Sequence, residues 1–388
     1  MRHGTSSLRP RGFVLAAAAV TGLAAALVCP AAGKAAETLR AYETLDPSAV
    51  TVSGLSSGGF FAHQFHIAYS GTVKGAGIVA GGPYACAEQA PPWLVFNPAR
   101  TLVMALGVCT YLKRDEYNAE LAFLGVRLPP APDPARSAES IRKEHRNGRI
   151  DDPVHLRAHR VWLFSGGRDK VVPRTTVGAL KAVYESFGLR APNLELADEA
   201  RAAHGLPIRE FTGTRPFPKR ACGDFGPPYL IDCDYDAAER ILRHLYAGRF
   251  KDEPGDPDPG GRIVEIDQTE FFRPGDDLIS MDPHGYLYVP ANCENGSAPP
   301  GACRLHVAFH GCNQTVRQIG DAFYRGADYN RWAVTNDIVV LYPQIRPDDF
   351  FNPEGCWDWW GYTGFDYDNR NGMQMRAVKA MIDRLLAR

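Results

Sequence analysis

Hydrophobic positions along the chain recur with two periods, one typical of buried strands and one typical of amphipathic helices. Short β-branched or apolar runs predict strands at Ala49–Ser53, Val73–Ala80, Arg160–Ser165, Asn193–Leu196, Ile263–Ile266, Tyr286–Val289, Arg304–Phe309 and Ile338–Tyr342. Apolar residues spaced three or four apart predict helices at Phe60–Tyr69, Thr175–Phe187, Tyr235–Tyr246 and Met373–Leu386. Strands that alternate with helices indicate an α/β fold with a largely parallel central sheet flanked by helices.

Two polar segments interrupt this pattern. Residues 113–153, which include the run PPAPDP, show little periodicity and predict a loop-and-helix insertion that could act as a lid. The stretch FKDEPGDPDPGG at 250–261 is dense in proline, glycine and charge, which predicts a linker or a long surface loop. The sequence contains no internal repeat, so we expect a single catalytic domain over residues 36–388.

The first 35 residues are typical of an export signal. Three arginines precede the apolar run Phe13–Val28, and the small residues of CPAAGKAAE follow it. This order predicts a Sec-type signal peptide over residues 1–35, cleaved near Gly33 or Ala35. An uncleaved membrane anchor is the alternative, but the apolar run is short for a full span. We expect a periplasmic or secreted protein with no stable membrane association.

Net charge and cysteine content limit the kinds of partner and cofactor that we expect. The 388 residues carry a formal net charge of −1, which gives no reason to expect a nucleic-acid partner. Of the 9 cysteines, Cys29 falls in the predicted signal peptide, which leaves 9 − 1 = 8. An even number of cysteines in an exported chain indicates disulfides. No CxxC pair occurs, so we expect no metal, and nothing in the sequence calls for a cofactor.

The stretch SGLSSGGF at 53–60 contains a candidate nucleophile. Gly54 to Gly58 match G-x-S-x-G between a predicted strand and a predicted helix, which is the context of a nucleophile elbow. The match predicts Ser56 as the nucleophile, with the backbone N–H of Ser57 contributing to an oxyanion hole. The alternative is a glycine-serine turn without chemistry.

A serine nucleophile needs a base and an acid that orients the base. Asp169 follows the predicted strand RVWLFS, and His204 lies in the loop after the next strand, so the order Ser, Asp, His is that of α/β hydrolases. Taken alone, Asp169 could be a turn residue and His204 one of 11 histidines.

The second oxyanion donor is predicted near the other end of the chain. The run RLHVAFHGCNQ at 304–314 ends a predicted strand in His310-Gly311-Cys312, which is similar to the HG-type oxyanion loops of esterases. The backbone N–H of Cys312 is the candidate donor, and a plain strand end with a structural cysteine is the alternative. If the donor is correct, the strand Arg304–Phe309 lies close to the strand Ala49–Ser53.

Several segments together resemble the polyhydroxybutyrate depolymerases that carry an N-terminal lipase box: SGLSSGGF, SGGRDKVVP, AAHGLPI, VAFHGCNQ, IVVLYPQ and NPEGCWDWWGY. The resemblance covers roughly residues 45 to 386. It implies a circularly permuted α/β-hydrolase fold and a serine esterase that hydrolyses poly(3-hydroxybutyrate) or its oligomers through a Ser-His-Asp triad and an acyl-enzyme. The loop AAHGLP differs from the expected AGH in lacking the glycine before His204 but keeps the histidine.

Four aromatic residues follow Cys356 closely: Trp357, Trp359, Trp360 and Tyr362. They predict an aromatic wall for an apolar polyester, with about half of the rings pointing into the cleft. Such rings would also suit a feruloyl or acetyl-xylan esterase or another polyester hydrolase, so these activities stay as alternatives, together with a non-catalytic binding protein. Since the hydrolase pattern runs almost to Arg388, we expect no separate binding module, and therefore activity on amorphous rather than crystalline polymer.

The eight cysteines allow 105 connectivities. We expect Cys312 to pair with Cys356, because both follow a glycine and the bridge would tie the oxyanion loop to the tryptophans. Proximity in the sequence favours three further pairs: Cys222–Cys233, Cys293–Cys303 and Cys86–Cys109.

Overall fold

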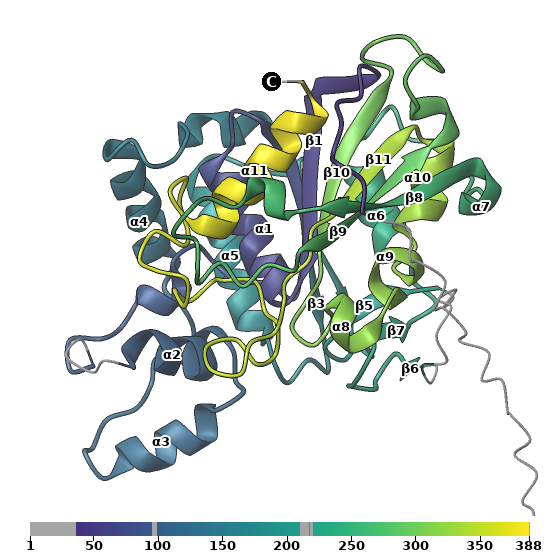
Figure 1. Ribbon diagram of the computed structural model, residues 1–388. Coiled ribbons are helices and arrows are strands. Elements are labelled where there is room, and N and C mark those ends of the chain that lie inside the picture. Colours follow the sequence, from purple (N-terminus) through teal and green to yellow (C-terminus); the bar gives the residue numbers. More distant parts are fainter. Residues whose placement is uncertain (1–35, 95–98, 210–216, 218–219, 388) are drawn as a thin grey trace, which may run out of the picture. The chain divides into compact units, whose positions relative to one another are not determined.

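An eight-stranded sheet forms the centre of the protein, in the order β4-β3-β2-β1-β10-β11-β9-β8 (Figure 1). The strands are β1 (Leu45–Leu55), β2 (Val73–Val79), β3 (Arg160–Gly166), β4 (Leu194–Glu199), β8 (Gly261–Asp267), β9 (His284–Pro290), β10 (Cys303–Phe309) and β11 (Ile338–Tyr342). The six strands from β4 to β11 run parallel, and β9 and β8 are antiparallel. The predicted α/β fold with a largely parallel sheet is confirmed.

The computed structural model describes residues 36–94, 99–209, 217 and 220–387. The predicted signal peptide, residues 1–35, lies outside the described residues. The described residues from 36 to 387 form one compact unit. Within the described ranges, no helix combines the length and the apolar character that crossing a membrane requires.

The chain begins the sheet in its middle. Strand β1 comes first in the sequence but lies between β2 and β10, with Gly54 opposite both Phe309 and Ile78. The last quarter of the chain then supplies β10 and β11, which continue the sheet on the other side of β1. The predicted proximity of residues 304–309 to residues 49–53 is confirmed, and the order is that of a permuted chain.

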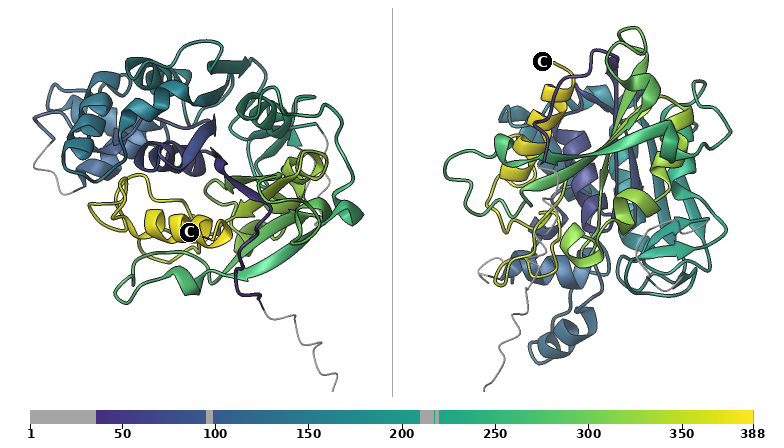
Figure 2. Two further views of the ribbon diagram at one scale, coloured as in Figure 1. Left: turned by 90° about the horizontal axis from the view of Figure 1, so that it is seen from above. Right: turned by 45° about the vertical axis from the view of Figure 1, so that its right-hand side comes forward.

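Helices cover both faces of the sheet (Figures 1 and 2). Helices α1 (Ser57–Ala68), α5 (Arg174–Ser186) and α11 (Met373–Leu385) lie on one face, and α6 (Ala237–Leu245) and α10 (Tyr329–Thr335) lie on the other. Short helices complete the connections: α7 (Pro257–Gly260), η4 (Thr269–Phe271), η5 (Ala291–Cys293), α8 (Val316–Ile319) and α9 (Ala322–Gly326). Helix α1 begins three residues before the prediction, because its first turn is serine and glycine and shows no apolar spacing.

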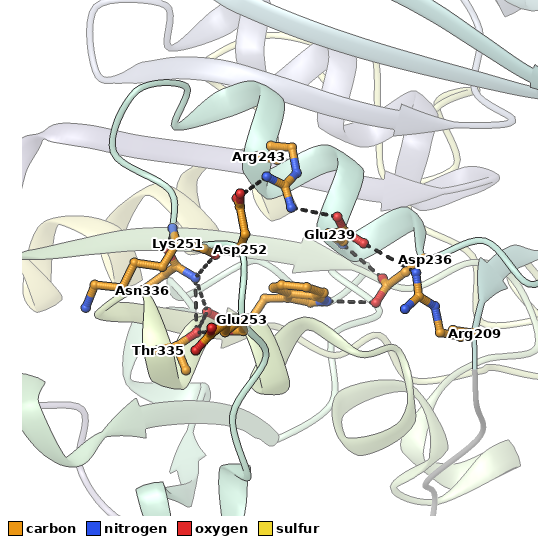
Figure 3. Close-up of polar contacts among 10 residues, drawn as sticks. Arg209, Asp236, Glu239, Arg243, Lys251, Asp252, Glu253, Thr335 and Asn336 are labelled. Carbon is orange, nitrogen blue, oxygen red and sulfur yellow. Dashed lines mark hydrogen bonds and ion pairs between the residues drawn. The ribbon is translucent and has the colours of Figure 1, made fainter.

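Polar contacts join α6 to α10 (Figure 3). The Asp236 carboxylate accepts from the Glu239 N–H at 2.9 Å, capping α6, and from the Trp332 indole N–H at 2.7 Å. Arg243 donates to Glu239 one turn away, and Asn336 at the end of α10 accepts from the Lys251 N–H at 2.6 Å. The buried Asp236 carboxylate and the Trp332 indole N–H therefore satisfy one another, which ties α6 to α10 on this face of the sheet.

A helical insertion separates β2 from β3. It comprises η1 (Cys86–Glu88), α2 (Arg100–Met104), the π-helical turn η2 (Ala105–Cys109), α3 (Arg114–Ala122), α4 (Pro134–Arg146) and η3 (Pro153–Ala158). The insertion therefore begins well before the predicted boundary at residue 113, because its first helices are short and too apolar to stand out from the core.

A second, three-stranded sheet was not predicted. It has the order β5-β7-β6, with β5 (Leu206–Ile208), β6 (Arg220–Ala221) and β7 (Leu230–Asp232). Strands of two or three residues are too short to produce a recognisable alternation. The loop after β4, which carries His204, leads into β5.

Candidate active site

A sharp turn connects β1 to α1 and carries Ser56. Its backbone lies at φ 55° and ψ −121°, a conformation that is unfavourable for a residue with a side chain. The turn needs glycine on both sides, because a Cβ at Gly54 would lie 2.1 Å from the Gly58 carbonyl oxygen, and one at Gly58 would lie 2.3 Å from the His310 carbonyl oxygen. The geometry is that of a nucleophile elbow.

Three of the predicted site residues are joined by hydrogen bonds. His204 Nε2 lies 2.9 Å from Ser56 Oγ, and His204 Nδ1 lies 2.8 Å from Asp169 Oδ2. Since a carboxylate only accepts, Nδ1 carries the hydrogen of the neutral ring and Nε2 accepts from the serine hydroxyl. The other carboxylate oxygen accepts from the N–H groups of Val171 and Val172 at 2.8 and 2.9 Å.

These partners are brought together by neighbouring strands. Asp169 follows β3 and His204 follows β4, so both lie at the carboxyl edge of the sheet, as does Ser56 after β1. The side chains of His204 and Asp169 are only 7% and 1% exposed. Water is therefore largely kept from the acid that orients the base.

The two adjacent serines of the turn have different surroundings. Ser57 is buried, and its hydroxyl accepts from the Trp357 N–H at 3.4 Å rather than facing the base. Its backbone N–H belongs to the first turn of α1, where an N–H has no partner within the helix. This arrangement suits Ser57 as an oxyanion donor and Ser56 as the nucleophile.

The loop after β10 lies against the elbow. A Cβ placed on Gly311 would lie 3.4 Å from Ser56 Cβ and 3.3 Å from the Leu55 carbonyl oxygen. The Gly311 N–H donates to the buried Gln314 side chain at 2.6 Å, whereas the Cys312 N–H has no partner among the described residues. The Cys312 N–H is thus the group of this loop that is available to an oxyanion. Sequence reasoning had not singled out Gln314.

His310 holds the same loop through a hydrogen bond at each nitrogen of its ring. Its Nδ1 lies 2.8 Å from the Gly311 carbonyl oxygen, and its Nε2 lies 3.2 Å from the Ile345 nitrogen. A carbonyl accepts and a backbone N–H donates, so the ring is neutral with its hydrogen on Nδ1. Burial lowers the pKa of His310 to about 4, although the Gly311 carbonyl acts in the opposite direction.

The eight cysteines form the four disulfides that we expected. The pairs are Cys86–Cys109, Cys222–Cys233, Cys293–Cys303 and Cys312–Cys356. The last bridge joins the candidate oxyanion loop to the tryptophan segment, here defined as Trp357–Trp360.

Two cavities border the site, one lined by Cys312 and the other by Asp169 and His204, and Leu112 of the insertion borders both. The apolar cavity has a volume of 650 Å³ and is lined among others by Leu102, Leu106, Cys312, Cys356, Trp359 and Trp360. The charged cavity has a volume of 710 Å³ and is lined among others by Tyr111, Arg168, Asp169, Lys170, His204 and Phe225. The cavity walls from the insertion come from residues 99–113, which overlap the predicted lid only at Lys113. Residues 99–113 are largely apolar but show no periodic pattern in the sequence.

The three tryptophans do not share one role. Trp359 and Trp360 line the apolar cavity, but Trp357 is fully buried and packs against Phe61 and Phe309. The expectation that Trp357 binds substrate is therefore wrong, because its ring completes the core beneath the elbow.

A buried carboxylate shapes the loop that follows. Asp358 accepts from the N–H groups of residues 360 to 363 and from the Thr363 hydroxyl, so the turn that presents Trp360 is held from within. Burial raises the pKa of Asp358, and the hydrogen bonds from Thr363 oppose that shift.

Comparison with known proteins agrees with this geometry. No protein-family model matches the chain. It is 37% identical over 375 residues, 96% of its length, to a poly(3-hydroxybutyrate) depolymerase of Delftia acidovorans, of which it spans 66%, just under two thirds. It is 30% identical over 372 residues to a polyhydroxybutyrate depolymerase of Talaromyces funiculosus, covering 93% of this chain and 96% of that protein.

Two solved structures are similar over 90% of this chain and 99% of their own. The crystal structure of PHB depolymerase from Penicillium funiculosum has a TM-score of 0.73 at 29% identity. A serine-to-alanine variant of a PHB depolymerase, complexed with an R3HB trimer, has a TM-score of 0.73 at 28% identity.

The fold and the elbow define a circularly permuted α/β hydrolase. The chain belongs to the polyhydroxybutyrate depolymerase family, a family of enzymes that hydrolyse ester bonds.

Proposed function

We propose that this protein is a serine esterase that hydrolyses poly(3-hydroxybutyrate) or its oligomers. The observation that carries the proposal is the unbroken chain of contacts from Ser56 Oγ through His204 to Asp169, in a member of this family. In the proposed reaction Ser56 is the nucleophile, His204 the general base and acid, and Asp169 the group that orients the base.

The reaction proceeds in two steps. Ser56 Oγ bonds to the ester carbonyl carbon while His204 Nε2 takes the hydroxyl proton, and the N–H groups of Ser57 and Cys312 stabilise the negative oxygen. When the ester C–O bond breaks, His204 returns the proton to the leaving oxygen, and the acyl group stays on Ser56. Water then repeats the sequence, freeing the acid and the serine.

The apolar cavity suits a polyester. Its walls include Trp359, Trp360 and several leucines, and its rim carries Phe350 and Phe351, which are 89% and 61% exposed. Two neighbouring exposed rings at the rim of an apolar cavity form a contiguous apolar surface, which favours contact with an apolar substrate.

The disulfides bear on where the enzyme works. Four disulfides fit a protein that works outside the cytoplasm. We propose that residues 1–35 act as a cleaved signal peptide and that the enzyme is periplasmic or secreted. N-terminal sequencing of the exported protein would test the cleavage near residue 35.

The decisive assay measures hydroxybutyrate products released from amorphous poly(3-hydroxybutyrate) and from the (R)-3-hydroxybutyrate trimer. The wild type should cleave both, and Ser56→Ala should cleave neither. Feruloyl and acetyl-xylan esters serve as comparison substrates; a higher kcat/KM on them than on the trimer would contradict the proposal. A parallel assay on crystalline polymer tests the expected preference for amorphous chains.

A further inference from the structure

The charged cavity contains two cations that the proposed reaction does not use. Arg168 and Lys170 flank Asp169 and line this cavity together with His204. Both are exposed, and neither has an ion-pair partner within the ranges that the structure describes. The acid between them, Asp169, is fully engaged by His204 and by two backbone N–H groups.

The wall under Arg168 is rigidly built. The Arg168 N–H donates to the Ala202 carbonyl oxygen at 2.9 Å, and its guanidinium lies over Gly223, where a Cβ would come within 2.9 Å of Nη1. Cys222, the neighbour of Gly223, accepts from the Ala203 N–H at 2.8 Å and is joined to Cys233. A small residue at position 223 thus leaves room for the Arg168 side chain beside the catalytic histidine.

The apolar cavity differs in this respect. Its one lysine, Lys113, forms an ion pair with Glu116 at 2.6 Å, and its other charged residue is an acid, Glu354. Unpaired positive charge is therefore concentrated on the His204 side of the nucleophile.

The direction of the ester bond determines which part of the substrate lies on the His204 side of the site. In a poly(3-hydroxyalkanoate), each ester joins the carboxyl carbon of one unit to the hydroxyl oxygen of the next. On cleavage the acyl fragment keeps the free hydroxyl end of the chain, and the leaving alcohol fragment keeps the free carboxylate end. His204 protonates the leaving oxygen, so the leaving fragment lies on the His204 side.

We propose that Arg168 and Lys170 bind the terminal carboxylate of the leaving fragment, so that the enzyme favours ester bonds near the carboxyl end of an oligomer. This inference rests on the proposed function. Charge-assisted contacts to a carboxylate are stronger than neutral ones, and a carboxylate is the only charge that a hydroxyalkanoate chain carries. Long polymer, with few chain ends, gains little from the two cations.

The test compares two trimers of (R)-3-hydroxybutyrate, one with a free terminal carboxylate and one with a terminal carboxamide. Cleavage of the internal esters is followed by chromatography at low ionic strength. The wild type should show a kcat/KM for the acid about five- to tenfold above that for the carboxamide, the range expected for one or two partly exposed charge contacts. In Arg168→Gln/Lys170→Gln this ratio should fall to about one.

Arg249→Gln/Lys251→Gln is the matched control, because it removes the same charge at the opposite edge of the sheet, where Arg304 of β10 donates to the Arg249 carbonyl oxygen. It should keep the wild-type ratio. Raising the salt concentration should lower the ratio of the wild type itself, which tests the charges without any substitution.

A wild-type ratio near one, or a wild-type ratio in the Arg168/Lys170 variant, would overturn the inference while leaving the proposed function intact. Failure of the wild type to cleave the internal esters of either trimer would contradict the proposed function and the inference with it.

Discussion

The triad residues come from three loops that are far apart in the sequence. The three tryptophans, in contrast, lie within four consecutive positions, 357 to 360. The structure joins the separated residues into one hydrogen-bonded chain and divides the neighbouring ones between core and cavity. The difference follows from geometry. A reaction needs groups that converge from several strand ends, while consecutive rings on one segment must point in different directions.

The largest effect is expected at the triad. Ser56→Ala or His204→Ala should lower kcat on the trimer by about three orders of magnitude or more, because nucleophile and base act as a unit. The thermal midpoint should change little, since neither side chain fills the core. The control is Ser57→Ala, which loses only a long hydrogen bond from Trp357 and keeps its backbone N–H. An active Ser56→Ala beside an inactive Ser57→Ala would move the nucleophile by one residue.

Trp357 should behave as a core residue. Trp357→Ala removes a fully buried ring and should cost about 3–5 kcal/mol in the free energy of unfolding, measured by denaturant titration. Trp357→Phe is the matched variant and should cost clearly less, because it keeps an aromatic ring and removes an indole N–H that has no partner in the described part of the chain. A stable Trp357→Ala with a raised KM would instead make this residue part of the cleft.

The Cys312–Cys356 bridge connects the two regions. Cys312→Ser/Cys356→Ser opens a link between residues separated by 44 positions and should cost about 2–4 kcal/mol in stability. It should also lower kcat roughly tenfold, because a displaced Cys312 N–H weakens oxyanion stabilisation. The control is Cys293→Ser/Cys303→Ser, at the amino end of β10. Equal kcat in both double variants would separate the bridge from the oxyanion loop.

His310 predicts a pH dependence of stability. Its pKa is lowered to about 4 in the folded protein and is about 6.5 when unfolded. Between these values the unfolded chain binds more protons, so the free energy of unfolding falls as the pH decreases from 6.5 to 4. His310→Asn keeps a donor towards Gly311 and should reduce that slope by up to about 1.4 kcal/mol per pH unit.

The exposed His145 on α4 provides the comparison for His310, and His145→Asn should retain the wild-type slope. A steep wild-type slope that survives in His310→Asn would assign the dependence to the other buried histidines, such as His306, whose pKa burial lowers to about 3.

The smallest effect is expected at Trp360. It is half-buried and lines the apolar cavity, so Trp360→Ala should raise KM for the trimer by about two- to fivefold and change stability little. Michaelis–Menten kinetics on the trimer and on a short acetate ester test this, because the short ester should not reach the ring. An unchanged KM on both substrates would remove Trp360 from the binding surface.

Much of the catalytic edge could be predicted because its residues obey local rules. Ser56, Asp169 and His204 each follow a strand of the parallel part of the sheet, and such strand ends meet at one edge. The position of Cys312 could be predicted from the same rule once β10 was placed beside β1.

The cavity walls could not be predicted in this way. Leu102 lies on the short helix α2 and Leu112 in the turn before α3, where the sequence has no periodic pattern. Arg168 and Lys170 are ordinary surface cations in the sequence. Their position near Ser56 depends on how the insertion and the second sheet pack, which is set by tertiary contacts. The burial of Trp357 follows from the same cause, since only its neighbours Phe61 and Phe309 reveal it.

The most direct test of the central claim is labelling with a serine-reactive fluorophosphonate, followed by peptide mapping of the modified residue. The account predicts one phosphonate per chain, attached to Ser56. It also predicts that His204→Ala is labelled much more slowly than the wild type, because the serine has lost its base. Attachment to Ser57, or no labelling of an enzyme that cleaves the trimer, would contradict it.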